Sequence, residues 1–319
     1  FDPLFKEVEG ENVVGVVEPA GRVERQVVLV GHHDSAPIYP FYERAAILYP
    51  IRLLLPAALY LLCMAVLAIR LIGLASGADE HPAGWARGLL ILGLAAVVPM
   101  YGFMSKRGSP GASDNLIGCG IALEAARALR GKLRSTRLVV LLADGEEAGQ
   151  KGSRAFIREN ADSLRSSPTN VLNFDTIVDD RDLTILSRDR NGLTPLSLAM
   201  ARELRRAASD LGIEAAVKGM PFFGGGTDAG QFALAGIEAS SIIGIPMSAV
   251  RREIVFHTSR DTPDRISRTA VASAIEIACE YVRRIDGLPA SRPARGPARR
   301  AMSYPNAPGS GTIGSRRQP

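Results

Sequence analysis

Histidine and carboxylate side chains recur where strand-like segments of this sequence end. Seven of them stand at such ends or in nearby loops: His32, Asp34, Asp114, Glu146, Glu147, Asp175 and His257. Open α/β sheets place their sites beyond the ends of strands, so these side chains can meet at one edge. Nitrogen and oxygen donors of this kind suit Zn²⁺, and a pair of ions needs a carboxylate that bridges them. The set therefore indicates a site for two zinc ions.

Two local patterns favour metal binding. His32 and Asp34 share one face of a strand, as a metal ligand and the carboxylate that orients it do, whereas His33 points the other way. Glu146 and Glu147 are adjacent, so they would repel each other unless a cation lies beside them.

Taken singly, these signals have simpler explanations. A histidine two residues before an aspartate also occurs in solvated turns, Asp114 suits a helix N-cap, and a lone His257 suits a structural role. The joint occurrence of all these residues in one chain is what favours a metal site.

Composition excludes several other classes of protein. The chain has 319 residues, with 38 Lys and Arg, 33 Asp and Glu and a net charge of +5. Residues 288–319 hold six Arg and no acid, so the rest of the chain is close to neutral, which argues against nucleic-acid binding. Three separated cysteines exclude a disulfide scaffold and a CxxC zinc site. The sequence begins with Phe1, which leaves an upstream signal peptide or anchor open.

Alternating strand and helix patterns must position these side chains. Strands are expected at 12–17, 27–31, 137–143, 170–174, 183–186 and 239–245, and helices at 115–130, 152–159, 196–211 and 268–285. Strands that alternate with helices and are apolar throughout predict an α/β fold, with a mainly parallel sheet covered by helices on both faces.

Residues 41–107 interrupt this pattern with the most apolar part of the chain. Residues 53–69 and 88–104 each run for 17 residues without a charge, near the lower limit for crossing a bilayer. They predict a transmembrane hairpin, with helices over about 53–75 and 86–104, that anchors the chain in the lipid bilayer. Two buried helices of a soluble domain, or a large apolar lid, are the alternatives. Basic residues at the domain end of the hairpin favour a cytoplasmic α/β domain.

The chain is thus expected to have four parts. Residues 1–40 and 108–287 form one α/β domain, and residues 41–107 form the inserted hairpin. Residues 288–319, rich in Arg, Pro and Gly, form a disordered tail.

In their order along the chain and in their amino-acid sequences, these segments resemble the M28 family of zinc peptidases. The motifs that carry the resemblance are GHHDS, PGASDN, DGEEAG with KGS, NFD, and FHT with RDTPDRI. They span most of residues 12–285 outside the insert. The resemblance implies a zinc exopeptidase fold of the phosphorylase/hydrolase-like kind and a peptidase, commonly an aminopeptidase, with two Zn²⁺ ions per chain.

The resemblance also implies a role for each candidate side chain. His32 and Asp175 would hold one zinc ion, Glu147 and His257 the other, and Asp114 would bridge both. Glu146 would be the general base and Asp34 would orient His32. The family often has a cis peptide bond after the bridging aspartate.

The sequence departs from the family pattern in three places. Leu116-Ile117-Gly118 stands where the family often has a small residue and a glycine after the asparagine. Ser113 stands where the family commonly has a second aspartate before the bridging one, although no ligand is lost. The larger departure is the insert 41–107, whose two ends lie beside the expected metal site.

A glycine-rich loop at 224–228 lacks the GK[ST] motif of a phosphate-binding loop. Members of the M28 family carry an aspartate in this loop that shapes the wall of the site, and the resemblance implies the same position for Asp228.

The resulting hypothesis is a membrane-anchored zinc metallopeptidase that removes N-terminal residues from peptide substrates. A non-catalytic receptor or scaffold with a peptidase-like fold is one alternative. A glutaminyl cyclase or another amidohydrolase on the same scaffold is a second alternative. The residues that bind substrate remain unassigned from the sequence.

Overall fold

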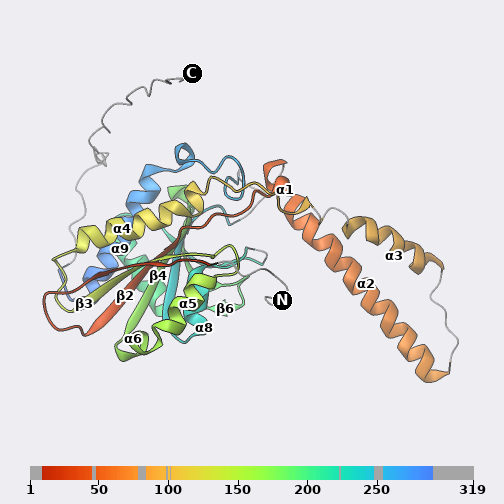
Figure 1. Cartoon of the computed structure of the whole chain (residues 1–319), viewed down its shortest axis with the longest axis horizontal. Helices are drawn as coiled ribbons and strands as arrows, with labels where there is room; N and C mark the ends of the chain where they lie inside the picture. The colour runs from red at the N-terminus through yellow and green to blue at the C-terminus, as the bar shows by residue number, and fades with distance from the viewer. Residues whose placement is uncertain are drawn as a thin grey trace, which may run out of the picture.

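The computed structural model describes most of the chain. The described residues are 9–44, 48–77, 84–97, 100, 102–222, 224–247 and 254–289. Most of the predicted tail, from residue 290 onward, lies outside these ranges. In Figure 1 the described residues form an α/β body from which two helices project.

An eight-stranded sheet forms the centre of the body. Its strands are β1 (Val13–Val17), β2 (Arg25–His32), β3 (Thr136–Ala143), β4 (Thr169–Ile177), β5 (Leu183–Asp189), β6 (Thr194–Pro195), β7 (Ala216–Gly219) and β8 (Glu238–Gly244). Their order is β1-β3-β2-β4-β8-β5-β6, with β7 beside β5. The central strands β3, β2, β4 and β8 are parallel, which confirms the prediction for the centre of the sheet. The outer strands β1 and β5 join it antiparallel.

The central strands are parallel and apolar because both faces of the sheet are covered. In β2, seven of the eight residues are buried, which fits an uninterrupted apolar strand better than an alternating one. Antiparallel edges were not anticipated, since strand patterns in a sequence do not give direction.

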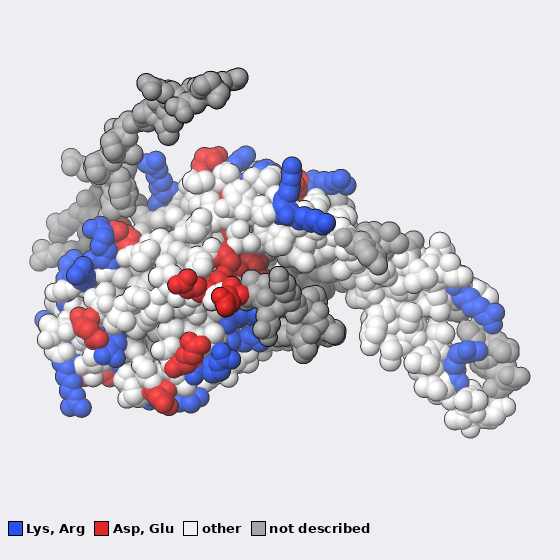
Figure 2. Space-filling model, in the orientation of Figure 1, with Lys and Arg blue, Asp and Glu red and all other residues white. Residues whose placement is uncertain are grey.

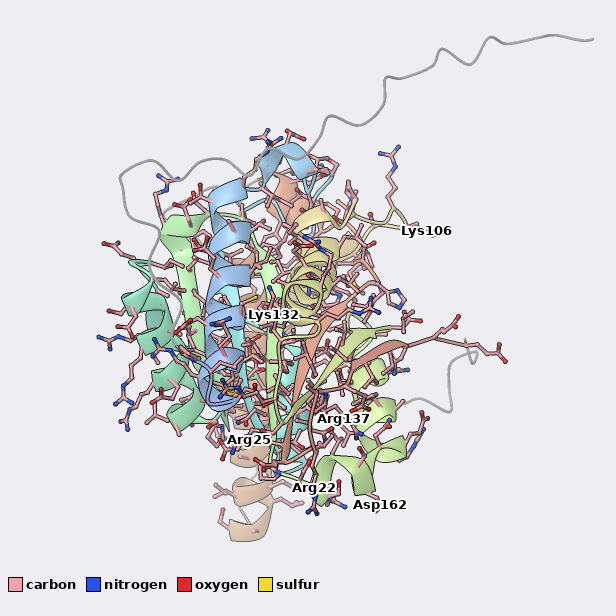
Figure 3. All side chains as sticks on the ribbon, turned by 90° about the vertical axis from the view of Figure 1, so that its left-hand side faces the viewer. Arg22, Arg25, Lys106, Lys132, Arg137 and Asp162 are labelled. Carbon is pink, nitrogen blue, oxygen red and sulfur yellow. The ribbon has the colours of Figure 1, made fainter. Side chains whose placement is uncertain are left out.

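Within the described residues, three helices cover each face of the sheet. Helices α4 (Ile117–Leu129), α7 (Leu198–Asp210) and α9 (Arg268–Ile285) bury their apolar residues in a core on one face. Helices α5 (Lys151–Glu159), α6 (Ala161–Ser166) and α8 (Asp228–Leu234) do the same on the other. Figure 1 shows the two layers, and Figure 3 shows α4 and α9 side by side. The prediction of helices on both faces is therefore confirmed.

The described part of the insert contains two helices that pack together, and their bounds differ from the expected ones. Helix α2 covers Leu48–Ser76 and α3 covers Gly84–Val97. The predicted start at 53 was too late, because proline is tolerated in the first turn of a helix and Pro50 did not delay it. Helix α3 ends at Val97 and residues 102–104 are not α-helical, so the predicted end at 104 was too late. A Cβ on Gly93 would lie 2.2 Å from Leu59, so the two helices approach closely.

One of these helices is long enough to cross a bilayer. Residues Ile51–Ser76 form a candidate span of 26 residues, and within the described residues no other helix qualifies. At about 1.5 Å per residue this helix reaches about 39 Å, whereas the 14 residues of α3 reach about 21 Å. By length and composition, α2 is therefore the one helix among the described residues that qualifies as a membrane span.

Candidate metal centre

Parallel strands bring three of the predicted segments to one edge of the sheet. His32 is the last residue of β2 and lies opposite Ala143, the last residue of β3. The loop that follows β3 therefore carries Glu146 and Glu147 past His32. Asp175 lies near the end of β4, the other neighbour of β2. Because the strands run in the same direction, their carboxyl ends meet, as expected for open α/β sheets.

Asp114 reaches the same edge from a short irregular helix, η3 (Ala112–Leu116), before α4. The peptide bond between Asp114 and Asn115 is cis, as expected from the family. Asp261 holds the segment, since its carboxylate accepts the N–H of Ser113 at 2.7 Å and that of Asp114 at 3.2 Å. The N-cap interpretation of Asp114 is wrong: helix α4 has no side-chain cap, because the carboxylate of Asp114 faces the site instead.

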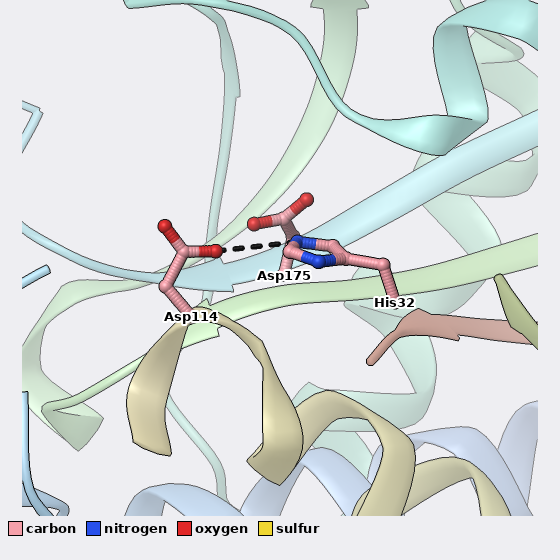
Figure 4. Close-up of side chains that lie close together, drawn as sticks. All are labelled: His32, Asp114 and Asp175. Atoms are coloured by element: carbon pink, nitrogen blue, oxygen red, sulfur yellow. Dashed lines mark ion pairs between the residues drawn. The ribbon is translucent and has the colours of Figure 1, made fainter. Parts of the chain in front are cut away.

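The two carboxylate oxygens of Asp114 face two different histidines. Oδ1 lies 3.2 Å from Nε2 of His32, and Oδ2 lies 3.0 Å from Nε2 of His257. His257 Nε2 also lies 3.4 Å from Oε1 of Glu147. Figure 4 shows Asp175 beside His32 and Asp114. Two groups able to hold a metal ion result, His32 with Asp114 and Asp175, and Asp114 with Glu147 and His257.

The donors in these groups fit zinc. Their ligand atoms lie within 4.8 Å of one another in each group, and all are nitrogen or carboxylate oxygen. Nε2 of His32 and Oε1 of Glu147 are buried and make no hydrogen bond of good geometry among the described residues. Buried polar atoms are normally satisfied, so these two atoms point to a missing partner.

The electrostatics of the cluster also favour a cation. Burial raises the pKa of Asp175 to about 8 and that of Glu147 to about 7. Burial opposes ionisation of Asp114 as well, but the close contacts with His257 and His32 outweigh it and hold its pKa well below the usual range. Carboxylates crowded together in this way cannot all be ionised unless a cation lies among them.

Glu146 lies beside the two groups and belongs to neither. Its Oε2 is 3.9 Å from Nε2 of His32, and its Oε1 accepts a hydrogen bond of 3.1 Å from Nε2 of Gln150. Burial raises its pKa well above the usual value for a glutamate. A carboxylate that holds its proton more tightly in a cleft is suited to act as a base and then as an acid.

Asp34 is connected both to a histidine and to the glutamate loop. Its main-chain oxygen lies 3.1 Å from Nδ1 of His32, and its Oδ1 lies 3.4 Å from the same nitrogen. Its carboxylate also accepts the N–H groups of Glu146 at 3.0 Å and Glu147 at 3.1 Å. The geometry thus brings Asp34 to His32 as expected, and adds a contact with the loop that the sequence pattern did not suggest. His33 points away, with Nε2 2.9 Å from the carbonyl of Glu11.

A cavity of about 450 Å³ opens onto this cluster. Five of the predicted residues line it, namely Asp114, Glu146, Glu147, Asp175 and His257. In Figure 2 acidic side chains gather near the middle of the body, while the projecting helices are mostly uncharged. Residues 224–227 line the wall, but Asp228 does not; it is buried at the start of α8.

Two aromatic residues in the cavity wall were missed by the sequence analysis. Tyr39 precedes the insert and Tyr42 lies at its beginning, and both line the cavity. No motif marked them. The contact of Asp261 with the backbone at Asp114 was also missed, although Asp261 lies in the motif RDTPDRI quoted above.

Comparison with known families gives one match. The family model described as peptidase family M28 matches residues 98–282, more than half of the chain. The match includes five of the seven candidate side chains, whereas His32 and Asp34 precede it. No curated protein matches the sequence.

Several solved structures share the fold. A zinc aminopeptidase from Bacillus subtilis is 18% identical with a TM-score of 0.55, and the match covers 86% of this chain and 50% of that one. An aminopeptidase from Aneurinibacillus sp. strain AM-1 is also 18% identical, with a TM-score of 0.52 and coverages of 89% and 48%. A Zn-dependent exopeptidase from Parabacteroides distasonis is 16% identical, with a TM-score of 0.52 and coverages of 85% and 76%. The chain thus spans about half the length of the first two proteins.

Proposed function

The chain belongs to peptidase family M28, and from that premise we propose that it is a zinc metallopeptidase with two zinc ions at the candidate metal centre. The observation that carries this proposal is the position of Asp114, whose two carboxylate oxygens face His32 and His257 separately. One ion would be held by His32, Asp114 and Asp175. The other would be held by Asp114, Glu147 and His257.

The chain's own residues supply the proton transfers of the proposed reaction. When bound, zinc at this site polarises the scissile carbonyl and lowers the pKa of a water molecule. Glu146 accepts a proton from the attacking water and delivers it to the leaving amine. Asp34 keeps the imidazole of His32 oriented and fixes the backbone of the glutamate loop through two N–H groups.

We also propose that the protein removes residues from the N-terminus of its peptide substrates. Two of the structures that share the fold are named aminopeptidases. Acetylation removes the free α-ammonium group of a peptide, so comparison of free and acetylated substrates is a direct test of this part.

Purified full-length protein is expected to contain about two zinc ions per chain by mass spectrometry and to hydrolyse aminoacyl anilides. The same anilides with an acetylated amino group are expected to be cleaved at least about 10-fold more slowly, because an aminopeptidase requires the free amino terminus that acetylation removes. Equal rates on both would contradict an aminopeptidase and favour an amidohydrolase. Protein without stoichiometric zinc and without hydrolysis would favour a receptor or scaffold.

We also propose that the insert anchors the chain in a membrane through α2. Large apolar side chains are exposed along this helix, for example Leu61 (66%), Ile72 (69%) and Leu74 (79%). A helix of a soluble core would bury such residues, and contiguous apolar patches on soluble proteins are small. Helix α3 packs beside α2 and would enter the bilayer with it.

Charges at the two ends of the insert bear on its orientation. Arg44, Lys106 and Arg107 lie at its domain end, and Figure 3 shows Lys106 projecting away from the body. Arg70 and Arg87 lie toward the far end. The excess of basic residues at the domain end supports a cytoplasmic catalytic domain.

Cell fractionation tests the anchor. The wild-type chain is expected in the membrane pellet, resistant to high salt and released by detergent. The double variant Leu61→Arg and Leu67→Arg is expected to move to the soluble fraction, since each Arg near the centre of a span costs about 3 kcal/mol. A matched pair on the body, Leu193→Arg with Leu234→Arg, also lies at exposed leucines and is expected to stay in the pellet. Wild-type protein in the soluble fraction would favour the lid interpretation.

A further inference from the structure

The loop that carries His257 is hydrogen-bonded to the two segments where the insert joins the body. We call residues 37–44 and 102–109 the insert root. The N–H of Tyr39 donates to the carbonyl of His257 at 2.8 Å. The hydroxyl of Ser109 donates to the carbonyl of Thr258 at 3.0 Å, and Glu43 accepts the N–H of Ser259 at 2.8 Å. Three consecutive residues of this loop are thus bonded to the insert root.

Aromatic rings strengthen the same connection. The ring of Tyr39 lies 4.5 Å from that of His257, edge to face at 75°. Phe103, from the other half of the insert root, lies 5.2 Å from Tyr39. Aromatic pairs in such geometries contribute about 0.5–1.5 kcal/mol beyond the apolar area that they bury. The imidazole is therefore packed against side chains that belong to the insert root.

His257 needs this support because of its backbone conformation. Its φ is +58°, in the left-handed region that non-glycine residues adopt at a cost. Such conformations persist where the surroundings determine them. The hydrogen bond from Tyr39 acts on the carbonyl of His257 itself, so it helps to fix the turn that aims Nε2 at Asp114.

Helix α2 in turn contacts both segments of the insert root. The two root segments pair through the N–H of Ile38 and the carbonyl of Arg107, at 2.9 Å. Arg52, in the second turn of α2, is only 4% exposed. Its guanidinium lies 3.9 Å from the ring centre of Phe41 and 5.0 Å from that of Phe103, and donates to the carbonyl of Gly102 at 3.2 Å. One side chain of the apolar helix therefore holds both root segments together.

We propose that the insert root positions His257, with Tyr39 as the positioning residue, and that the insert thereby sets the affinity of the zinc site formed by Asp114, Glu147 and His257. This inference rests on the proposed two-zinc function. It connects the apolar insert to the chemistry, because the insert root contacts a residue assigned to zinc, His257. The site formed by His32, Asp114 and Asp175 does not depend on His257 and is expected to be insensitive.

Two substitutions of Tyr39 test the inference in the full chain. Tyr39→Leu keeps an apolar side chain but removes the ring, whereas Tyr39→Phe keeps the ring. Zinc content is measured after dialysis against increasing concentrations of a chelator. Tyr39→Leu is expected to lose one of its two ions at about a 10-fold lower chelator concentration than wild type, as for other residues that orient a metal ligand. Tyr39→Phe is expected to match wild type, and the second ion to be retained in both.

Substitutions in the insert separate positioning from general damage. Arg52→Leu is expected to lower the chelator resistance of the same ion by a smaller factor, because Arg52 acts through Phe103. Arg87→Leu, an exposed arginine on α3, is expected to change neither ion. Thermal unfolding shows whether Tyr39→Leu folds. If it does not fold, the chelator resistance of Arg52→Leu and Ser109→Ala is measured instead and tests the same positioning role.

The outcomes distinguish this inference from the function on which it rests. Wild-type resistance of both ions in Tyr39→Leu would overturn the positioning role while leaving the two-zinc proposal intact. Equal loss of both ions would also overturn it, since the effect would not be specific to His257. Wild-type protein that holds no zinc would instead refute the proposed function itself.

Discussion

Replacing Glu146 by Gln is expected to lower the turnover of aminoacyl anilides by about 10³-fold while leaving about two zinc ions bound. The amide has nearly the shape of the carboxylate but cannot accept and return a proton. Its oxygen can still accept the hydrogen bond from Gln150, so the local structure should persist. Because Glu146 belongs to neither ligand group, the metal content should be unchanged. Steady-state kinetics and mass spectrometry on the same preparation check both parts.

Two comparisons make this result specific. Glu159→Gln, at a 65% exposed side chain on α5, removes the same charge away from the site and is expected to retain full activity. Loss of zinc together with activity in Glu146→Gln would mean that Glu146 is a ligand. Unchanged activity would mean that another group carries the proton.

The sequence could place both glutamates at the site but could not separate their roles from spacing alone. They are adjacent in a loop, where successive side chains do not have to point to opposite sides as they do in a strand. The structure separates them, because Glu147 faces His257 at 3.4 Å while Glu146 turns toward His32 and Gln150. The resemblance to M28 peptidases implies the roles of ligand for Glu147 and general base for Glu146, and this assignment stays a prediction that the Glu146→Gln variant tests.

The positions of side chains at strand ends were predictable from the sequence, because the carboxyl ends of neighbouring parallel strands lie at the same edge of the sheet. His32 and Asp175 follow this rule directly, since their strands β2 and β4 are neighbours. Tyr39 and Asp261 do not, because their positions depend on how long loops return to the site. The same reason explains why the insert was recognised by its apolar composition, while its contacts with the His257 loop were not.

Asp114→Asn is expected to remove both zinc ions, so that metal content falls from about two per chain to well under one and hydrolysis falls at least as far as in Glu146→Gln. Each oxygen of Asp114 faces a different histidine, so one side chain contributes to both sites. The amide cannot offer two anionic oxygens, and its NH₂ group would face a cation or an imidazole. Zinc content after gel filtration measures the effect.

Substitutions at unshared ligands show whether Asp114 truly bridges. Asp175→Asn removes a ligand from the His32 site alone, and His257→Ala removes one from the Glu147 site alone, so each is expected to leave about one ion. If Asp114→Asn also kept about one ion, the two sites would not share this residue, and its geometry would reflect only hydrogen bonding to the histidines. If all three variants lost both ions, the sites would be interdependent through more than Asp114. The proposed arrangement requires two ions in the wild type, one in each single-site variant and almost none without the shared aspartate, because only Asp114 contributes an oxygen to both groups.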